Sequence, residues 1–226
     1  MTDFGASYSG TRDRVETYFD RTATAVWDRL TSDAPVSRIR QTVREGRDRM
    51  RATMLSRLPE DLGGARVLDA GCGTGAMTAE LAARGAIVTA ADISPALIGI
   101  ARERLPGSLQ SSVRFVAGDM LSDDLGRFDY VLAMDSLIYY GTADILAAIG
   151  RLAARTDGRI VFTVPPKTAL LSAMWTMGRL FPRSDRSPLM VPQDHRALTR
   201  ATAGRIAHVA RVSRGFYISD CLEHRA

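Results

Sequence analysis

The sequence predicts an α/β protein with a Rossmann-like fold, in which helices cover both faces of a mostly parallel, seven-stranded sheet. Apolar runs alternate with helical stretches from residue 66 onward, which is typical of parallel βαβ units. A glycine-rich loop follows the first run, as in many nucleotide-binding sheets. With 226 residues, 46% of them apolar, the chain is long enough to form one such domain with additions.

Two helical segments precede the first expected strand. Apolar residues recur on one face of residues 12–30, and a second helical segment spans residues 35–58. A proline and a pair of glycines follow the second segment and end it. We therefore expect residues 1–62 to form a helical cap that packs on a catalytic domain of residues 63–226.

Seven apolar runs are expected to form the sheet. The first five, which alternate with helices, are residues 66–70, 86–91, 113–117, 128–134 and 159–164. Two more, residues 206–212 and 216–223, are expected to form strands that turn at Gly215.

The helix boundaries between these runs are also marked in the sequence. Gly85 is expected to end the helix before the second strand, because glycine is favoured just after a helix. Ser94 is expected to cap the next helix, with Pro95 at its first position. Residues 165–200 break the alternation, and we expect them to include a helical lid over the functional edge of the sheet.

The first strand runs into a glycine loop, residues 67–75, which reads Val-Leu-Asp-Ala-Gly-Cys-Gly-Thr-Gly. Glycines let the backbone approach a ligand closely at the carboxyl end of a strand, where open α/β sheets bind ligands. The acid suits a ligand ammonium group, and the N-terminus of the following helix favours a carboxylate. The residues expected to bind a cofactor here are Asp69, Gly71, Cys72, Gly73 and Gly75.

Acidic residues follow the next two strands as well. Asp92, with Ile93 beside it, comes roughly 20 residues after the first acid, the offset at which an acid binds ribose hydroxyls in Rossmann sites. Asp119 and Met120 follow the third strand, where we expect the acid to bind an adenine amino group and the methionine to cover the ring. Met134 ends the fourth strand, at the position expected to face the reacting group.

Composition argues against several classes of protein. The net charge is +5, but the basic residues are dispersed and no basic run is interleaved with aromatics, so no nucleic acid partner is expected. No apolar stretch reaches the roughly 20 residues of a membrane span, and the first residues lack the layout of a secretory signal. We expect a cytoplasmic protein, with peripheral membrane contact left open. Isolated histidines such as His195 and His208 are more often structural, and no protein-bound metal is expected.

Residues 66–164 resemble the class I S-adenosylmethionine-dependent methyltransferases. A narrower resemblance, nearly end to end, is to the magnesium-protoporphyrin O-methyltransferases of chlorophyll and bacteriochlorophyll synthesis. It rests on Tyr-Phe-Asp at 18–20, Met-Asp-Ser-Leu-Ile-Tyr-Tyr at 134–140, Pro-Lys-Thr at 166–168, Phe-Pro at 181–182 and Gly-Phe-Tyr at 215–217. This resemblance implies transfer of a methyl group from S-adenosylmethionine to the ring-C propionate of magnesium-protoporphyrin IX, which forms the monomethyl ester. It also implies a magnesium chelatase as a partner that supplies the substrate.

The resemblance implies two catalytic residues. An active-site tyrosine of this family matches Tyr18, and a histidine commonly stands where this sequence has Tyr139. A propionate resembles a glutamate side chain, whose pKa is about 4.3, so it is ionised at neutral pH and acts as its own nucleophile. We therefore predict that both tyrosines orient groups by hydrogen bonding, although either could instead be a core aromatic.

The acceptor is expected to lie between the segment after the fourth strand and the lid. Tyr140 in that segment and Met174, Trp175 and Met177 in the lid offer apolar surface for a flat macrocycle. The same lid residues also fit an ordinary core helix or one that rests on a membrane interface.

Three other functions stay open at this point. A quinone or other phenol is an alternative acceptor, but a phenol has a pKa of about 10 and needs a base. Gly71, Gly73 and Ala76 also satisfy a permissive dinucleotide fingerprint, which allows a nicotinamide-dependent oxidoreductase. Asp69, Gly75 and the N-terminal helices favour the methyltransferase. A partner protein that binds the cofactor without turnover is the last alternative.

Overall fold

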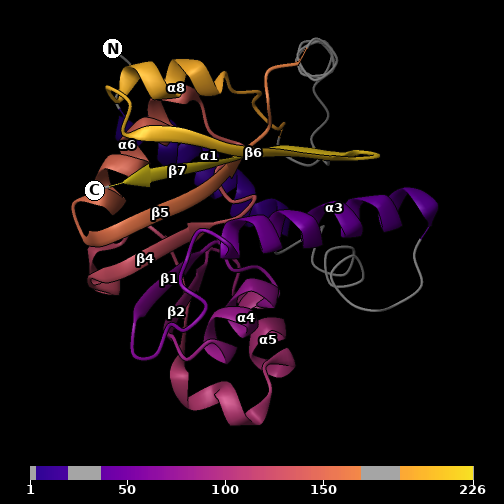
Figure 1. The fold of residues 1–226 in the computed structure, drawn as a ribbon, viewed down its shortest axis with the longest axis vertical. Coiled ribbons are helices and arrows are strands. Elements are labelled where there is room, and N and C mark those ends of the chain that lie inside the picture. Colours follow the sequence, from indigo (N-terminus) through magenta and orange to yellow (C-terminus); the bar gives the residue numbers. More distant parts are fainter. Residues whose placement is uncertain (1–3, 20–36, 169–188, 226) are drawn as a thin grey trace.

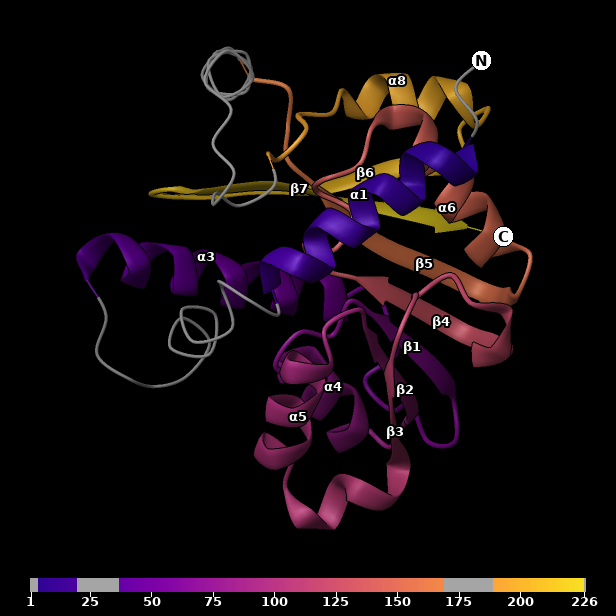
Figure 2. The ribbon, with the colours of Figure 1, turned by 180° about the vertical axis from the view of Figure 1, so that it is seen from behind.

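In the computed structural model, the residues described are 4–19, 37–168 and 189–225. They form a seven-stranded sheet of order β3-β2-β1-β4-β5-β7-β6 with helices on both faces (Figures 1 and 2). The strands are β1 (Arg66–Ala70), β2 (Ile87–Asp92), β3 (Val113–Ala117), β4 (Phe128–Ala133), β5 (Thr156–Val164), β6 (Ile206–Arg214) and β7 (Tyr217–Arg225). The helices are α1 (Phe4–Tyr18), α3 (Arg38–Leu55), α4 (Ala76–Ala83), α5 (Pro95–Arg104), α6 (Thr142–Ala153) and α8 (His195–Ala201).

The strand pairing matches the mostly parallel sheet expected from the sequence. Strands β1 to β5 are parallel, whereas β7 is antiparallel to both β5 and β6. The hairpin of β6 and β7 turns at Gly215, as predicted, with a φ of 57° that suits glycine. Phe216 was expected in the last strand but lies at the turn, because the ladder ends where Arg214 pairs with Tyr217.

Two of the predicted helix signals are present. The Ser94 side chain accepts a hydrogen bond from the backbone N–H of Leu97, and Pro95 opens α5. Gly85 follows the end of α4 with a φ of 89°. The expected first helix, residues 12–30, begins earlier in the structure, at Phe4, and its part beyond Phe19 lies outside the described residues.

The core has one layer on each face of the sheet because the central strands are buried on both sides. In β1, Val67 packs into the cluster that α3, α4 and α5 cover, whereas Leu68 and Ala70 pack into the cluster that α1, α6 and α8 cover. All three side chains are fully buried. A strand that is apolar on both faces is typical of a parallel sheet between helical layers, which is why this run has no polar alternation.

The strand order places a ligand-binding crevice at a defined edge. The connections run outward in opposite directions from β1 and β4, so a gap opens at the carboxyl ends of these neighbouring strands. The glycine loop after β1 leads directly into α4, whose N-terminus faces the same edge. The candidate site is therefore expected there.

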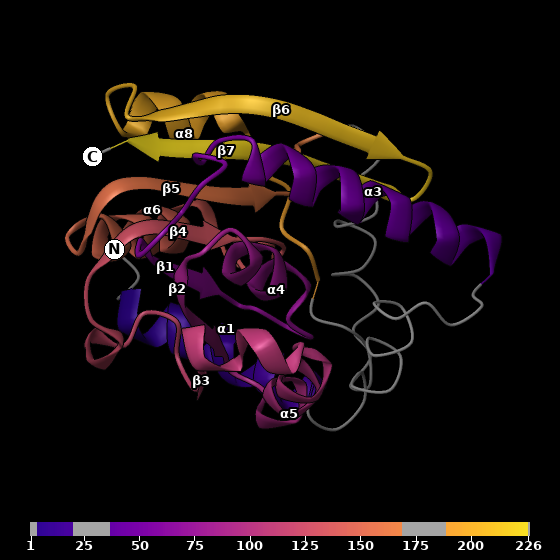
Figure 3. The same ribbon diagram turned by 60° about the horizontal axis from the view of Figure 1, so that its bottom comes forward.

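Helix α3 and the β6–β7 hairpin run alongside each other beyond the sheet (Figures 1 and 3). Their close approach depends on Gly46, because a Cβ built at this position would lie 2.7 Å from Cβ of Tyr217. The backbone N–H of Gln193 donates to the carbonyl oxygen of Pro165, and its carbonyl oxygen accepts from the N–H of Lys167, so the start of the segment 165–200, expected to include the lid, is joined to a later part of the same segment. Within the described parts of the chain, no helix has the length and apolar character needed to span a bilayer.

Candidate active site

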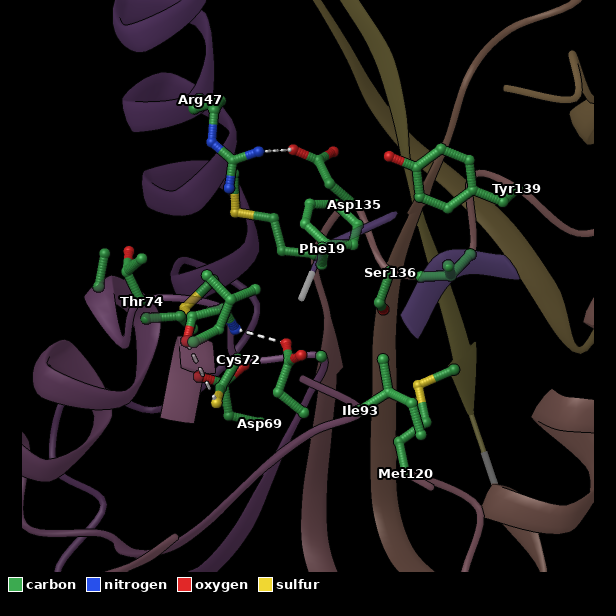
Figure 4. A pocket seen from close by; sticks show the side chains of 18 of the residues that line it. Phe19, Arg47, Asp69, Cys72, Thr74, Ile93, Met120, Asp135, Ser136 and Tyr139 are labelled. Carbon is green, nitrogen blue, oxygen red and sulfur yellow. Dashed lines mark hydrogen bonds and ion pairs between the residues drawn. The ribbon is translucent and has the colours of Figure 1, made fainter. Parts of the chain in front are cut away.

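A cavity of about 310 Å³ opens at the carboxyl ends of β1, β2 and β4, between α1 and α3 (Figure 4). Most of the residues predicted to form the site line this cavity. They are Asp69, Gly71, Cys72, Gly73, Asp92, Ile93, Asp119, Met120, Met134, Tyr139 and Tyr140. Two predicted residues, Tyr18 and Gly75, are not among its lining residues. Met174, Trp175 and Met177 lie outside the described residues.

The glycine loop is held in place by the end of the neighbouring strand. The backbone N–H groups of Gly71 and Cys72 both donate to the carbonyl oxygen of Ala91, at 2.8 and 3.0 Å. The N–H of Gly73 donates to Asp92 Oδ2 at 2.8 Å. Gly71 and Gly73 have φ values of 81° and 54°, in the left-handed region that favours glycine. The shape of the loop is thus held by contacts within the protein itself.

Gly75 acts on the loop from outside the cavity. It is the N-cap of α4, has a φ of 84°, and a Cβ there would lie 3.0 Å from Cβ of Ala101. Glycine is therefore required at this third position of the motif for two reasons, the left-handed backbone conformation and the close packing against α5. Its predicted contact with a cofactor stays a prediction.

Asp69 is an acid with little access to water. Its side chain accepts a hydrogen bond from Thr78 Oγ1 at 2.6 Å and the residue is 1% exposed. Burial, together with the nearby charge of Asp92, raises the pKa of Asp69 to about 7, although the hydrogen bond from Thr78 opposes this shift. A cationic ligand group in the cavity would favour the ionised form.

Asp119 joins the site to the N-terminal helix. Its Oδ1 accepts hydrogen bonds from the Tyr8 hydroxyl and the N–H of Leu121, each at 2.8 Å, and its Oδ2 lies 3.3 Å from Nη1 of Arg12. The ring of Tyr8 stacks on that of Tyr140 with centroids 4.9 Å apart. Burial raises the pKa of both tyrosines, so both hydroxyls stay protonated. Tyr140 therefore lies at the Asp119 end of the cavity, and its predicted contact with the acceptor stays a prediction.

An ion pair between α3 and the segment after β4 borders the other end of the cavity. Arg47 Nη1 lies 2.6 Å from Asp135 Oδ2, and Figure 4 shows the arginine reaching from α3 toward the aspartate. Asp135 Oδ1 accepts hydrogen bonds from the hydroxyls of Tyr217, at 3.1 Å, and Thr163, at 3.2 Å. Asp135 has a φ of 55°, an uncommon conformation for a residue other than glycine. Four residues from distant segments thus hold one another in position.

The two predicted catalytic tyrosines are placed differently. Tyr139 lines the cavity, and in Figure 4 its hydroxyl points toward the side where Asp135 lies. Tyr18 is half-buried at the end of α1, where its ring packs edge-on against Phe19 with centroids 5.2 Å apart. Phe19 is the member of this pair that lines the cavity, and it also contacts Tyr139 edge-on.

Several cavity residues were not identified from the sequence. Tyr8, Arg12 and Phe19 reach the cavity from α1 and the residue after it, and Arg44, Arg47, Asp48 and Arg51 reach it from α3. The α3 arginines are spaced three and four positions apart, so they share one helix face. That spacing was a signal in the sequence, but nothing local indicated which face would meet the site.

A pair of histidines and an acid lie outside the cavity. The rings of His195 and His208 lie with centroids 4.5 Å apart and planes tilted by 32°, and each histidine has a nitrogen 3.4 Å from a carboxylate oxygen of buried Asp220. Arg211 donates to both oxygens of that carboxylate, at 2.6 and 2.9 Å. Because this bidentate pair already neutralises the acid, we interpret the group as a link between α8 and the β6–β7 hairpin.

The donor set of the cavity fits an adenosyl amino acid. Carboxylates at the ends of three successive strands suit an ammonium group, ribose hydroxyls and an adenine amino group, in the order in which the strands lie. The arginines of α3 and the N-terminus of α4 suit a carboxylate. Fold and site together define a class I S-adenosylmethionine-dependent methyltransferase.

Comparisons with known proteins narrow this class. Residues 67–156 match the model of a methyltransferase domain, and residues 133–226 match that of the magnesium-protoporphyrin IX methyltransferase C-terminus. The chain is 59% identical to the magnesium-protoporphyrin O-methyltransferase of Rhodobacter capsulatus, over 97% of this chain and 99% of the relative. It is 32% identical to the Synechocystis protein of the same name, over 92% and 94% of the two chains. The chain belongs to the magnesium-protoporphyrin O-methyltransferase family.

A solved structure supports the same assignment. The magnesium protoporphyrin IX methyltransferase of Synechocystis with bound SAH superposes with a TM-score of 0.78 at 28% identity, covering 95% of this chain and 99% of that one. A structure of the same protein with bound SAM gives a TM-score of 0.75 at 26% identity. The predicted class I fold and the predicted methyl donor are thereby confirmed, and the nicotinamide-dependent alternative is set aside.

Proposed function

We propose that this chain transfers a methyl group from S-adenosylmethionine to the ring-C propionate of magnesium-protoporphyrin IX and so forms the monomethyl ester. The observation that carries this proposal is the 59% identity to a magnesium-protoporphyrin O-methyltransferase over nearly the whole of both chains. The magnesium ion is part of the substrate, and the chain needs no metal of its own for this reaction.

The proposed chemistry needs no general base. S-adenosylmethionine, when bound, supplies a sulfonium-linked methyl group, which a carboxylate oxygen takes by in-line displacement to give a neutral ester and S-adenosylhomocysteine. The propionate is ionised at neutral pH, as its pKa of about 4.3 requires. The work left to the chain is to hold the reacting atoms in line and to exclude water.

The cavity residues suit these tasks. Asp69, Asp92 and Asp119 are proposed to bind the ammonium group, the ribose and the adenine amino group of the donor. Met134, which is 8% exposed, is proposed to pack beside the reacting centre. Tyr139 is proposed to orient the acceptor with its hydroxyl, and Tyr18, which does not itself line the cavity, is proposed to do so from the end of α1.

The direct test is a mass-spectrometric assay of the purified protein with S-adenosylmethionine and magnesium-protoporphyrin IX. The expected product is a porphyrin that has gained one methylene, about 14 Da, together with S-adenosylhomocysteine. Metal-free protoporphyrin and a catechol serve as alternative acceptors. Tight binding of S-adenosylhomocysteine with methylation of the catechol alone would replace the proposed acceptor by a phenol, and binding without any turnover would support a non-catalytic partner.

We further propose weak peripheral contact with an anionic membrane surface. Ile39 at the start of α3 and Phe216 at the hairpin tip are 54% and 73% exposed, and Arg38 and Arg40 flank the first of them. Apolar side chains beside arginines favour a negatively charged interface. Replacement of Ile39 and Phe216 by Ser should reduce sedimentation with phosphatidylserine-containing vesicles. Ile87→Ser, at a position 56% exposed elsewhere, should leave it unchanged.

A transfer of substrate from a magnesium chelatase is also proposed, because the metallated porphyrin is poorly soluble and its supplier must insert magnesium first. No described residue identifies a docking surface. Co-incubation with the chelatase should shorten the lag before ester appears, relative to free magnesium-protoporphyrin at the same concentration. An unchanged lag would argue against direct transfer.

A further inference from the structure

Arg155 is a buried cation that forms no ion pair with a carboxylate of the described residues. It follows α6, is 8% exposed, and its Nε has no hydrogen-bond partner among those residues. Burial lowers the pKa of Arg155 because it disfavours the charged form, although the charges of Asp123 and Asp119 oppose this shift. An apolar side chain would avoid the cost of burying a charge. The hydrogen bonds of the guanidinium are therefore what an arginine adds at this position.

These hydrogen bonds go to the backbone of the connection between β3 and β4. Nη2 of Arg155 donates to the carbonyl oxygen of Met120 at 2.8 Å, and Nη1 donates to that of Ser122. Arg151, in the last turn of α6, donates from Nη2 to the carbonyl oxygen of Leu121 at 3.1 Å. Three consecutive carbonyl oxygens thus accept hydrogen bonds from two arginines. We call Arg151 and Arg155 the arginine clamp.

The same peptide groups bind Asp119 with their N–H groups. The N–H of Leu121 donates to Asp119 Oδ1 at 2.8 Å, and the N–H of Ser122 donates to the backbone carbonyl oxygen of Asp119 at 3.0 Å. A peptide group is planar, so the direction of its carbonyl fixes the direction of its N–H. A cation at the carbonyl also polarises the group and strengthens its N–H as a donor. Two peptide groups therefore connect the arginine clamp to Asp119.

This arrangement leaves one oxygen of Asp119 available to a ligand. Oδ1 already accepts hydrogen bonds from the N–H of Leu121 and from the hydroxyl of Tyr8. Oδ2 lies 3.3 Å from Nη1 of Arg12, and the Asp119 side chain is 22% exposed at the cavity. A carboxylate oxygen accepts more than one hydrogen bond, so Oδ2 can take a further donor such as an adenine amino group.

We propose that the arginine clamp positions the carboxylate of Asp119 for the amino group of the donor's adenine ring and so makes the site selective for adenine. Neither Arg151 nor Arg155 lines the cavity, so both are positioning residues that act through Asp119. This inference rests on the adenine-binding role proposed above for Asp119. It assigns a task to a buried charge that the methyl transfer itself does not use.

The affinities of two ligands for Arg155→Lys, made in the full chain, test the arginine clamp. S-inosylhomocysteine carries a carbonyl oxygen in place of the amino group of S-adenosylhomocysteine, so it cannot donate to Asp119 there. The wild type should bind S-adenosylhomocysteine about 10- to 100-fold more tightly, because the analogue lacks a hydrogen bond to a charged group. Lysine keeps the charge but lacks the planar fork that reaches two carbonyl groups, so this ratio should fall below about threefold.

Two further measurements separate positioning from a general loss of structure. Hydrogen exchange at the Leu121 amide should become at least about tenfold faster in Arg155→Lys, whereas exchange at Leu132 within β4 should not change. The KM for S-adenosylmethionine should rise while kcat at saturating donor stays within about twofold, because adenine is remote from the transferred methyl group.

Arg127→Gln is the matched control for these measurements. Arg127 is exposed and donates to the carbonyl oxygen of Ala154 and to Asp157, not to the connection between β3 and β4. This variant should keep the wild-type ratio of affinities and the wild-type exchange rate at Leu121.

The outcomes distinguish the arginine clamp from the assignments on which it rests. A wild type that binds both ligands equally overturns the role of Asp119, and the ester assay tests the proposed reaction separately. A wild type that discriminates, with an Arg155→Lys protein that discriminates equally well, overturns the arginine clamp, as does faster exchange at Leu132. If Arg155→Lys does not fold, Arg151→Gln decides, because the Arg151 side chain is 47% exposed. That variant should lower the ratio about two- to threefold, and an unchanged ratio would overturn the arginine clamp.

Discussion

The hydroxyl of Tyr8 donates a hydrogen bond to Asp119 Oδ1 across 2.8 Å, and this contact joins α1 to the end of β3. The two residues are 111 positions apart in the sequence. Tyr8 is 4% exposed and its ring stacks on Tyr140, so the hydroxyl has little alternative access to water. The helix that borders the cavity is therefore held by the acid expected to bind adenine.

Replacement of Tyr8 by Phe should lower stability without abolishing donor binding. Loss of a hydrogen bond to a charged group is expected to reduce the free energy of unfolding by about 1.5–3 kcal/mol. Asp119 keeps its contacts with Leu121 and Arg12, so S-adenosylhomocysteine should still raise the Tm of the variant. Urea unfolding with and without S-adenosylhomocysteine measures both effects. An unchanged free energy of unfolding would show that this contact contributes little.

Affinity for S-adenosylhomocysteine should fall as the pH drops below about 7. Burial raises the pKa of Asp69 to about 7 in the free protein, so below this pH the acid is largely protonated. The ammonium group of the ligand favours the carboxylate, and binding at low pH must therefore release a proton. Calorimetric titrations between pH 5.5 and 8.5 measure the slope. Asp69→Asn should bind weakly with no such slope, and a wild type with none would contradict the assignment.

Two glycine substitutions should have opposite effects. Gly71→Ala should abolish binding of S-adenosylhomocysteine, because φ is 81° and the new methyl group would overlap Ser136. Gly150→Ala, in the exposed face of α6 with no atom within 4 Å of its Cβ, should raise stability by about 1 kcal/mol. Thermal melts and ligand titrations of both variants compare the sites. A Gly71→Ala protein with normal affinity would show that the loop can move.

The docking of α3 on the hairpin should depend on the small size of residue 46. Gly46→Ala would place a methyl group 2.7 Å from Cβ of Tyr217, so helix and hairpin must separate. Because Tyr217 and Arg47 both hold Asp135, we expect a lower Tm together with a higher KM for the porphyrin. Gly99→Ala, in α5 with open space around it, is the control. Wild-type values in Gly46→Ala would mean that the interface adapts.

Replacement of Tyr139 by Phe should slow methyl transfer about tenfold. The pH dependence of the rate between pH 6 and 8 should stay the same as in the wild type. The residue is predicted to orient the acceptor, and the propionate needs no base in that range. Single-turnover rates at saturating donor measure the chemical step. Tyr18→Phe tests the second predicted tyrosine in the same assay. A rate that falls with decreasing pH only in the wild type would instead indicate a base at position 139.

The sequence by itself determined the sheet and the residues proposed to bind the cofactor. Each strand is a short apolar run between turn signals, and the acids Asp69, Asp92 and Asp119 follow consecutive parallel strands. Because all parallel strands of such a sheet end at one edge, local position along the chain was enough to bring these acids together. The position of the glycine loop could be predicted from its spacing alone for the same reason, because it directly follows one of these strands.

The part of the cavity around Asp135 was decided by the tertiary structure alone. Arg47 and Asp135 are 88 positions apart, and Tyr217 reaches the same carboxylate from a further strand. Such contacts depend on how α1, α3 and the hairpin pack, and no local periodicity encodes which face of a helix meets which strand end. The sequence also gave no sign that the Ser136 hydroxyl is buried without a hydrogen-bond partner among the described residues, because burial is a property of the packed chain.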